Sequence, residues 1–354
     1  RDRSVSRGLG DVYKRQDYVY RQKLKLITTN NVLETLQEVI EAKRGTVCIF
    51  CNSIDSIDSF YRLIPELSNA CTFCSEDGQY KLWKGNRRKK SMMITELERY
   101  NFFTSRFYSA VDILCKNPPH VIFVSDLYGA AQSVIDPATE AIQIIGRFRG
   151  GVNSVTHIAS IRPELECMSS SEIDHWIQGA STIFNGWKAQ LARTTNIGER
   201  TLLQEAIGEN SYLPYLDENG KPDSFLIANF YEKEQVKRLY TSADLLHLAY
   251  EQTGYFVFSH EERLMPVSDN ERMAIQHRLA KKKRAELIVR KLEEMEKMSR
   301  ATDKKIQKRY QRMLMNLITS TADRYIYDCF CRFGAEFVRE ADYNENKLLS
   351  LIHI

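Results

Sequence analysis

The stretch HVIFVSD, residues 120–126, is a short apolar run rich in β-branched and aromatic residues that ends in a serine and an aspartate. Four similar runs lie on either side of it: TVCIFC at 46–51, ACTFC at 70–74, NFFTS at 101–105 and SVTHIAS at 154–160. Such runs predict strands, and helices are expected between them at residues 28–43, 53–67, 91–100 and 137–149. The alternation predicts an α/β fold with a parallel sheet between helices, where ligands bind beyond the C-terminal ends of the strands.

The chain has 354 residues, 43% hydrophobic and 27% charged, which is enough for two ordinary domains. Amphipathic patterns replace strand-like runs after Arg162, so we expect an α/β lobe at residues 17–161 and a mostly helical accessory region at 162–347. Within the latter, Asn219 and Gly220 between two apolar runs predict a hairpin near residues 212–230. Residues 271–318 read as one or two long helices. No run of eighteen apolar residues offers a membrane span, so a cytoplasmic protein is expected.

The two ends of the sequence have an unusual composition. RDRSVSRGLGDVYKRQ at residues 1–16 and the last residues, 348–354, resemble translated adapter sequence at the edges of assembled contigs. We expect both to be artefacts and leave them out of the fold prediction.

The segment TEAIQIIGRFRGG, residues 139–151, is the most specific motif. Asp136 and Pro137 precede it as an expected N-cap and first-turn proline, and two glycines follow it as terminators. On a helix the four-residue spacing of Gln143 and Arg147 places both on one face, while Phe148 is expected to enter the core. Two arginines at a helix end suit a charge-dense ligand such as a nucleoside triphosphate.

QIIGRFR resembles motif VI of superfamily 2 helicases, and its short GRxR form is similar to that of origin-binding-protein-type helicases. NFFTSRFYSAVDI, residues 101–113, resembles motif V, with Ala110 where the family has glycine; residues 45–64 resemble motif IV. The resemblance covers residues 17–161 and implies a RecA-like second lobe. It implies catalytic roles for Arg147 and Arg149, nucleotide contacts for Gln143, Gly146 and Asp112, and nucleic-acid contacts for Thr104, Ser105 and Arg106. Asp112 would face the nucleotide or hold the arginines in place, and strand termination is an alternative role for Thr104 and Ser105.

The sequence contains no GxxxxGK[ST] motif and no DExx strand to follow one. The resemblance therefore implies that ATP and Mg²⁺ are bound only in a complete two-lobe enzyme, together with an N-terminal RecA-like lobe, and that this chain alone is inactive. DNA or RNA is the implied partner, with DNA preferred. The alternative is a non-enzymatic nucleic-acid- or protein-binding module on a RecA-like scaffold.

Two CxxC pairs, Cys48 with Cys51 and Cys71 with Cys74, have the spacing of a zinc site. Both pairs lie in strand-like runs, where residues three apart point to opposite faces, so we expect buried thiols and no metal. His157 lies in an alternating strand and is expected to pack rather than to react.

Residues 278–312 carry fourteen Lys and Arg against five Asp and Glu, although the net charge of the whole chain is only +4. This concentration suggests a polyanion partner, with Lys282 and Lys308 as candidate nucleic-acid contacts. The interspersed glutamates leave a salt-bridged surface helix as the alternative.

Overall fold

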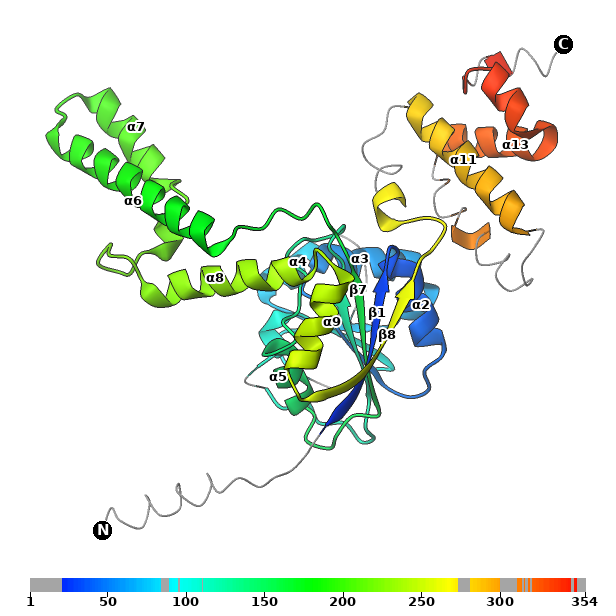
Figure 1. Cartoon of the computed structure of the whole chain (residues 1–354), viewed down its shortest axis with the longest axis horizontal. Coiled ribbons are helices and arrows are strands. Elements are labelled where there is room, and N and C mark those ends of the chain that lie inside the picture. Colours follow the sequence, from blue (N-terminus) through cyan, green and yellow to red (C-terminus); the bar gives the residue numbers. More distant parts are fainter. Residues whose placement is uncertain are drawn as a thin grey trace, which may run out of the picture.

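The computed structural model describes residues 21–83, 89–94, 96–109, 111–272, 281–299, 311–313, 315, 318, 320–344 and 347–348. Within this part of the chain the strands are β1 (Gln22–Thr29), β2 (Val47–Phe50), β3 (Cys71–Phe73), β4 (Lys89–Ser91), β5 (Tyr100–Phe103), β6 (His120–Ser125), β7 (Ser154–Ser160) and β8 (Phe256–Arg263). They form one parallel sheet in the order β4-β3-β5-β2-β6-β7-β1-β8. The neighbouring strands β7, β1 and β8 are labelled in Figure 1. The prediction of an α/β fold with a parallel sheet is confirmed.

The helices are α2 (Val32–Glu41), α3 (Ile54–Leu63), α4 (Glu76–Trp83), α5 (Glu140–Gly146), α6 (Ser170–Arg193), α7 (Ile197–Gly208), α8 (Ser224–Leu239), α9 (Ala243–Gln252), α11 (Lys281–Ser299) and α13 (Thr321–Glu340). In the part of the chain that the structure describes, three single 3₁₀ turns lie at Pro65–Leu67, Ser105–Phe107 and Leu213–Tyr215. In the described residues no helix is long and apolar enough to cross a membrane.

The five predicted strands are present, each with its bounds within two residues of the prediction. Three strands were not predicted, β1, β4 and β8. The helix predicted at residues 28–43 starts too early, because β1 continues to Thr29 and the side chain of Asn31 caps α2 by accepting from the N–H of Glu34. The helix predicted at residues 91–100 is wrong: Ser91 ends β4, Tyr100 begins β5, and the described residues between them form bends and irregular backbone. The Asn101 side chain bonds both backbone groups of Glu98.

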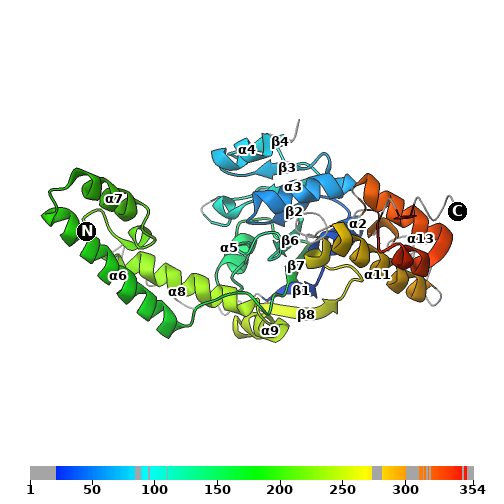
Figure 2. The same cartoon turned by 90° about the horizontal axis from the view of Figure 1, so that it is seen from above.

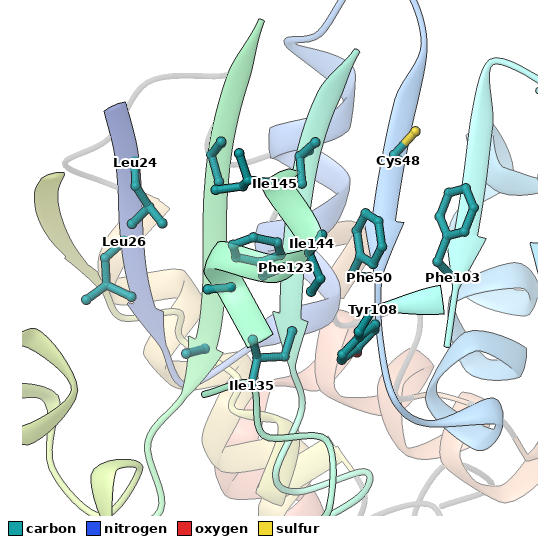
Figure 3. Packing of buried hydrophobic residues seen from close by; sticks show 14 of the residues in the cluster. Leu24, Leu26, Cys48, Phe50, Phe103, Tyr108, Phe123, Ile135, Ile144 and Ile145 are labelled. Atoms are coloured by element: carbon teal, nitrogen blue, oxygen red, sulfur yellow. The ribbon is translucent and has the colours of Figure 1, made fainter. Parts of the chain in front are cut away.

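Two apolar cores cover the two faces of the sheet because alternate strand residues point to opposite sides. Along β2, Val47 and Ile49 join the core beneath α2 and α3, whereas Cys48 and Phe50 join the core beneath α5. Phe50 stacks on Phe103 with ring centroids 5.0 Å apart, on the face that Figure 3 shows. Helices therefore cover both faces, as in doubly wound folds.

The sheet is completed by residues far beyond the expected boundary at Arg162. β8 pairs with β1 over its whole length, and α9 packs Leu246 and Tyr250 into the core on the α5 side. A buried hydrogen-bond network ties these later residues to the sheet. His157 Nδ1 lies 2.7 Å from the Tyr250 hydroxyl, and Ser125 donates to the Tyr240 hydroxyl at 3.1 Å. The region after residue 161 is thus partly built into the lobe, and His157 packs as expected.

Between β7 and α9 the chain forms an arm of α6, α7 and α8 that extends away from the sheet (Figure 1). The hairpin predicted near residues 212–230 is present only as one antiparallel bridge between Leu216 and Pro222. The second apolar run is not a strand but the start of α8, because Asp223 accepts the N–H groups of Phe225 and Leu226 as its N-cap. Capping chemistry decides between helix and strand here.

The last helices, α11 and α13, pack against each other on the opposite side of the sheet from the arm (Figure 2). Helix α11 confirms the helical prediction for part of the segment 271–318; residues 273–280, 300–310, 314, 316 and 317 lie outside the described ranges. Arg312 joins this part to the lobe by pairing with the nearly buried Glu34 at 3.1 Å.

Candidate functional site

Helix α5 presents the two motif arginines at its C-terminal end. Ala141, Ile144 and Ile145 on its inner face are buried against the sheet, and the Phe148 ring meets Phe50 edge-on at 6.1 Å. The core position expected for Phe148 is therefore confirmed. With the inner side occupied, Gln143 and Arg149 are exposed and Arg147 is only partly buried.

The arginines are held at their Nε atoms. Arg147 Nε donates to the carbonyl of Gln143 at 3.1 Å, and Arg149 Nε donates to a carboxylate oxygen of Asp112 at 3.1 Å. Within the described residues, the terminal nitrogens of these two guanidinium groups make no hydrogen bond. Each arginine therefore keeps donors in the fork geometry that binds phosphate or carboxylate.

The segment that resembles motif V contacts this helix end directly. Besides the ion pair of Asp112 with Arg149, the N–H of Ile113 donates to the carbonyl of Arg147 at 2.9 Å. Of the two contacts expected for Asp112, the one with an arginine is present. The side chains in that pair are 62% and 48% exposed, so the pair is screened by water and contributes little to stability, about 0–1 kcal/mol.

Gly146 lies beside the arginines and leaves its surroundings open. A Cβ added there would meet no atom within 4 Å. Nothing in the described chain uses the space that the missing side chain provides. Ala110, the other departure from the motif, lies outside the described residues.

Thr104, Ser105 and Arg106 follow the end of β5. The Thr104 hydroxyl is nearly buried and donates to the carbonyl of Phe73 at 3.4 Å, whereas Ser105 and Arg106 are exposed in a short 3₁₀ turn. The parallel strands end here, while Arg147 and Arg149 lie just before the start of β7. The structure thus brings Asp112 to the arginines near the N-terminal ends of the strands. It leaves Thr104 at their C-terminal ends.

A buried carboxylate cluster that sequence reasoning missed lies where β6 and β1 end. Asp126 accepts from the Ser56 hydroxyl at 2.9 Å and from the Gly129 N–H at 3.0 Å. Asp269 accepts from the Val32 N–H at 2.6 Å and pairs with Arg272 at 3.0 Å. Burial raises the pKa of Asp269 to about 6, with Arg272 opposing and Asp126 adding to the shift. The sequence signal was the serine, aspartate and glycine after the apolar run of β6.

The four cysteines of the CxxC pairs do not converge. Cys48 and Cys71 belong to the core on the α5 side, and Cys51 and Cys74 belong to the core on the opposite face. Burial raises the pKa of Cys51 well above its usual range and that of Cys74 to about 11, so these groups remain thiols at neutral pH. The sheet itself separates the two cysteines of each pair, which contradicts a shared zinc site.

Lys282, on α11, pairs with Asp342 at 2.6 Å while both side chains are more than half exposed. Lys308 lies outside the described residues. Other charges of the basic segment are also paired: Lys291 bonds both Glu271 and Glu294, and Arg290 lies near the same acids. Such pairing agrees with the alternative interpretation of residues 278–312 as a salt-bridged surface helix, for the part of that segment that the structure describes.

A comparison of the chain with models of known protein families found no match, and a comparison with curated proteins found no relative. Among the described residues, no group of three or more acidic, histidine or cysteine side chains is arranged to hold a metal ion.

Proposed function

We propose that this chain is the second motor lobe of an ATP-dependent DNA or RNA helicase or translocase, and that it supplies motif V and the motif VI arginine finger. The observation that carries the proposal is the junction of the two motif-like segments. Asp112 holds Arg149, and the backbone of Ile113 holds that of Arg147. Segments that resemble neighbouring helicase motifs in sequence are thus in contact in space, on a parallel α/β sheet compatible with a RecA-like lobe.

The two arginines have the donors that a transferring phosphoryl group requires. With each Nε anchored, the terminal nitrogens of Arg147 and Arg149 would stabilise the negative charge that develops on the γ-phosphate. Gln143, one turn before Arg147, and the open space beside Gly146 would let the nucleotide approach the helix end.

The residues of this lobe could form only one side of a site for ATP and Mg²⁺. The donor set contains arginines, but the sequence has no P-loop lysine and no DExx carboxylate for Mg²⁺. Both would therefore be held mainly by a first lobe, with ATP supplying the free energy for movement along the strand. The chain alone is expected to hydrolyse no ATP.

A two-lobe protein, made by joining this chain to a P-loop lobe encoded upstream in the same gene, tests the proposal. Arg147→Ala and Arg149→Ala should each lower the kcat of nucleic-acid-stimulated ATP hydrolysis by roughly 10³-fold or more. Arg193→Ala, an exposed arginine on α6, is the matched control and should leave kcat unchanged. Normal turnover in both motif variants, or the absence of any P-loop lobe, would favour the non-enzymatic binding module.

For the nucleic-acid strand we propose contacts with the exposed Ser105 and Arg106 at the end of β5, with Thr104 shaping the turn. DNA is preferred over RNA because QIIGRFR is similar to the motif of origin-binding helicases. Fluorescence anisotropy with single-stranded DNA and RNA of equal sequence should show binding that weakens with salt and is reduced by Arg106→Ala.

A further inference from the structure

A pocket of about 410 Å³ lies beyond the C-terminal ends of the strands, away from the arginines of α5. Three segments line it: the end of β2, the loop from β6 into α5, and one side of α8. Its lining residues are Asn52, Gln132, Val134, Asp136, Thr139, Glu140, Asn229, Glu232, Lys233, Val236 and Lys237. A cavity of this size falls within the range of small-molecule sites, about 300–1,000 Å³.

The pocket lies at the point where the connections of the sheet reverse direction. From β2 the chain continues into α3, which packs on one face, whereas from its neighbour β6 it continues into α5, which packs on the other. Two neighbouring strands whose connections diverge in this way leave a crevice beyond their carboxyl ends, and open α/β sheets bind ligands there. Asn52 follows β2, and the loop of Gln132 and Val134 follows β6, so both rims of the crevice belong to the pocket.

Three of the polar side chains that line the pocket are amides, one from each lining segment. Among the described residues, the side chains of Asn52, Gln132 and Asn229 make no hydrogen bond, so all three are available to a ligand. Each amide offers both a donor and an acceptor. Asparagine and glutamine recognise the edge of a nucleobase through this pairing of donor and acceptor. Val134 and Val236 add apolar wall against which a ring can pack.

The charges of the pocket argue against a polyphosphate. Three acids face two lysines, and Lys237 is already bonded to Glu234 at 2.6 Å. Asp136 accepts from the Ala138 N–H and the Thr139 hydroxyl, so its charge is fixed in the wall. No excess of positive charge remains to attract a triphosphate.

Two buried hydroxyls close to this wall have no partner in the described structure, Tyr108 and Ser133. Tyr108 lies near Ile135 at the ends of the strands (Figure 3). Burial raises the pKa of Tyr108, and the carboxylate of the pocket residue Glu140 adds to the effect. Buried polar atoms without partners are uncommon in folded proteins and mark places where a ligand or water is bound.

We propose that this pocket binds an uncharged heterocyclic ligand of nucleoside size through the amides of Asn52, Gln132 and Asn229. The site is separate from the motor function, because neither arginine of the α5 end lines it. It would exist in the chain even if the helicase proposal were wrong.

The test is isothermal titration of the full chain with adenosine, guanosine, cytidine and uridine, and with ATP for comparison. At least one nucleoside should bind, and more tightly than ATP. Asn52→Ala and Asn229→Ala should each weaken that binding about tenfold, the effect of one lost hydrogen bond. Gln204→Ala, an exposed amide on α7, is the matched control and should have no effect.

Circular dichroism of each variant shows whether it is folded, and a variant that fails to fold is replaced by the corresponding serine substitution. Arg149→Ala should leave nucleoside binding unchanged. The proposal is overturned if no nucleoside binds up to its solubility limit, if binding survives both amide substitutions, or if Arg149→Ala abolishes it.

Discussion

Replacing His157 by glutamine should remove a large part of the acid sensitivity of the fold. His157 is fully buried between Ser125 and Tyr250, and burial lowers its pKa from 6.5 to about 3. The folded protein therefore keeps the ring neutral at a pH where the unfolded chain binds a proton. The stability that this group contributes is complete above pH 6.5 and is lost progressively as the pH falls towards 3.

The size of the effect follows from the difference between the two pKa values. Each unit corresponds to about 1.4 kcal/mol, so His157 should cost the folded protein about 2 kcal/mol at pH 5 relative to pH 7.5, and about 5 kcal/mol below pH 3. Asp269 acts in the opposite direction, since its pKa is raised to about 6 and its contribution increases as the pH falls. The contribution of His157 to the pH dependence of stability is therefore isolated only by comparing the wild type with a His157 variant.

Urea unfolding followed by circular dichroism at pH 7.5 and pH 5 provides the measurement. The loss of unfolding free energy between the two pH values should be about 2 kcal/mol smaller in His157→Gln than in the wild type. His175→Gln, an exposed histidine on α6, is the control and should behave as the wild type does. Equal pH dependence in the wild type and His157→Gln would refute a neutral buried ring.

Two smaller predictions concern packing. Gly129→Ala should lower the free energy of unfolding by about 1–3 kcal/mol, because its Cβ would overlap a carboxylate oxygen of Asp126. Gly146→Ala meets no atom and should be neutral or slightly stabilising; urea unfolding of both variants checks the pair, and equal effects would contradict it. In a native alkylation time course read by mass spectrometry, the exposed Cys331 should react first and the buried Cys51 only on unfolding; early modification of Cys51 would argue against its place in the core.

How far the sequence predicts this fold depends on how each strand is buried. Val47–Phe50 of β2 is fully buried on both faces, so its apolar run was recognisable in isolation. β8 escaped prediction because it is an edge strand with alternating exposure, and its C-terminal half carries His260, Glu261 and Arg263. β1 was missed because Lys23 and Lys25 interrupt its apolar pattern on the more exposed side.

The sequence predicted only those parts of the candidate site that depend on spacing within one helix. The side of α5 that carries Arg147 and the inward position of Phe148 follow from helical spacing alone. The pairing of Asp112 with Arg149 needed the family resemblance, since no local pattern joins residues so far apart. The pocket beside Asn52 could not be predicted, because α8 reaches it only after the chain has passed through α6 and α7.

The place of β8 beside β1 has a consequence for biosynthesis. β1 is synthesised more than 220 residues before β8 ends, so its outer edge stays unpaired until the ribosome has completed the arm, α9 and β8 itself. Unpaired edges of this kind favour association with other nascent chains. A product released after β7 would also lack Tyr250, which bonds His157, and Tyr240, which accepts from Ser125, so the lobe can close only when translation has passed Arg263.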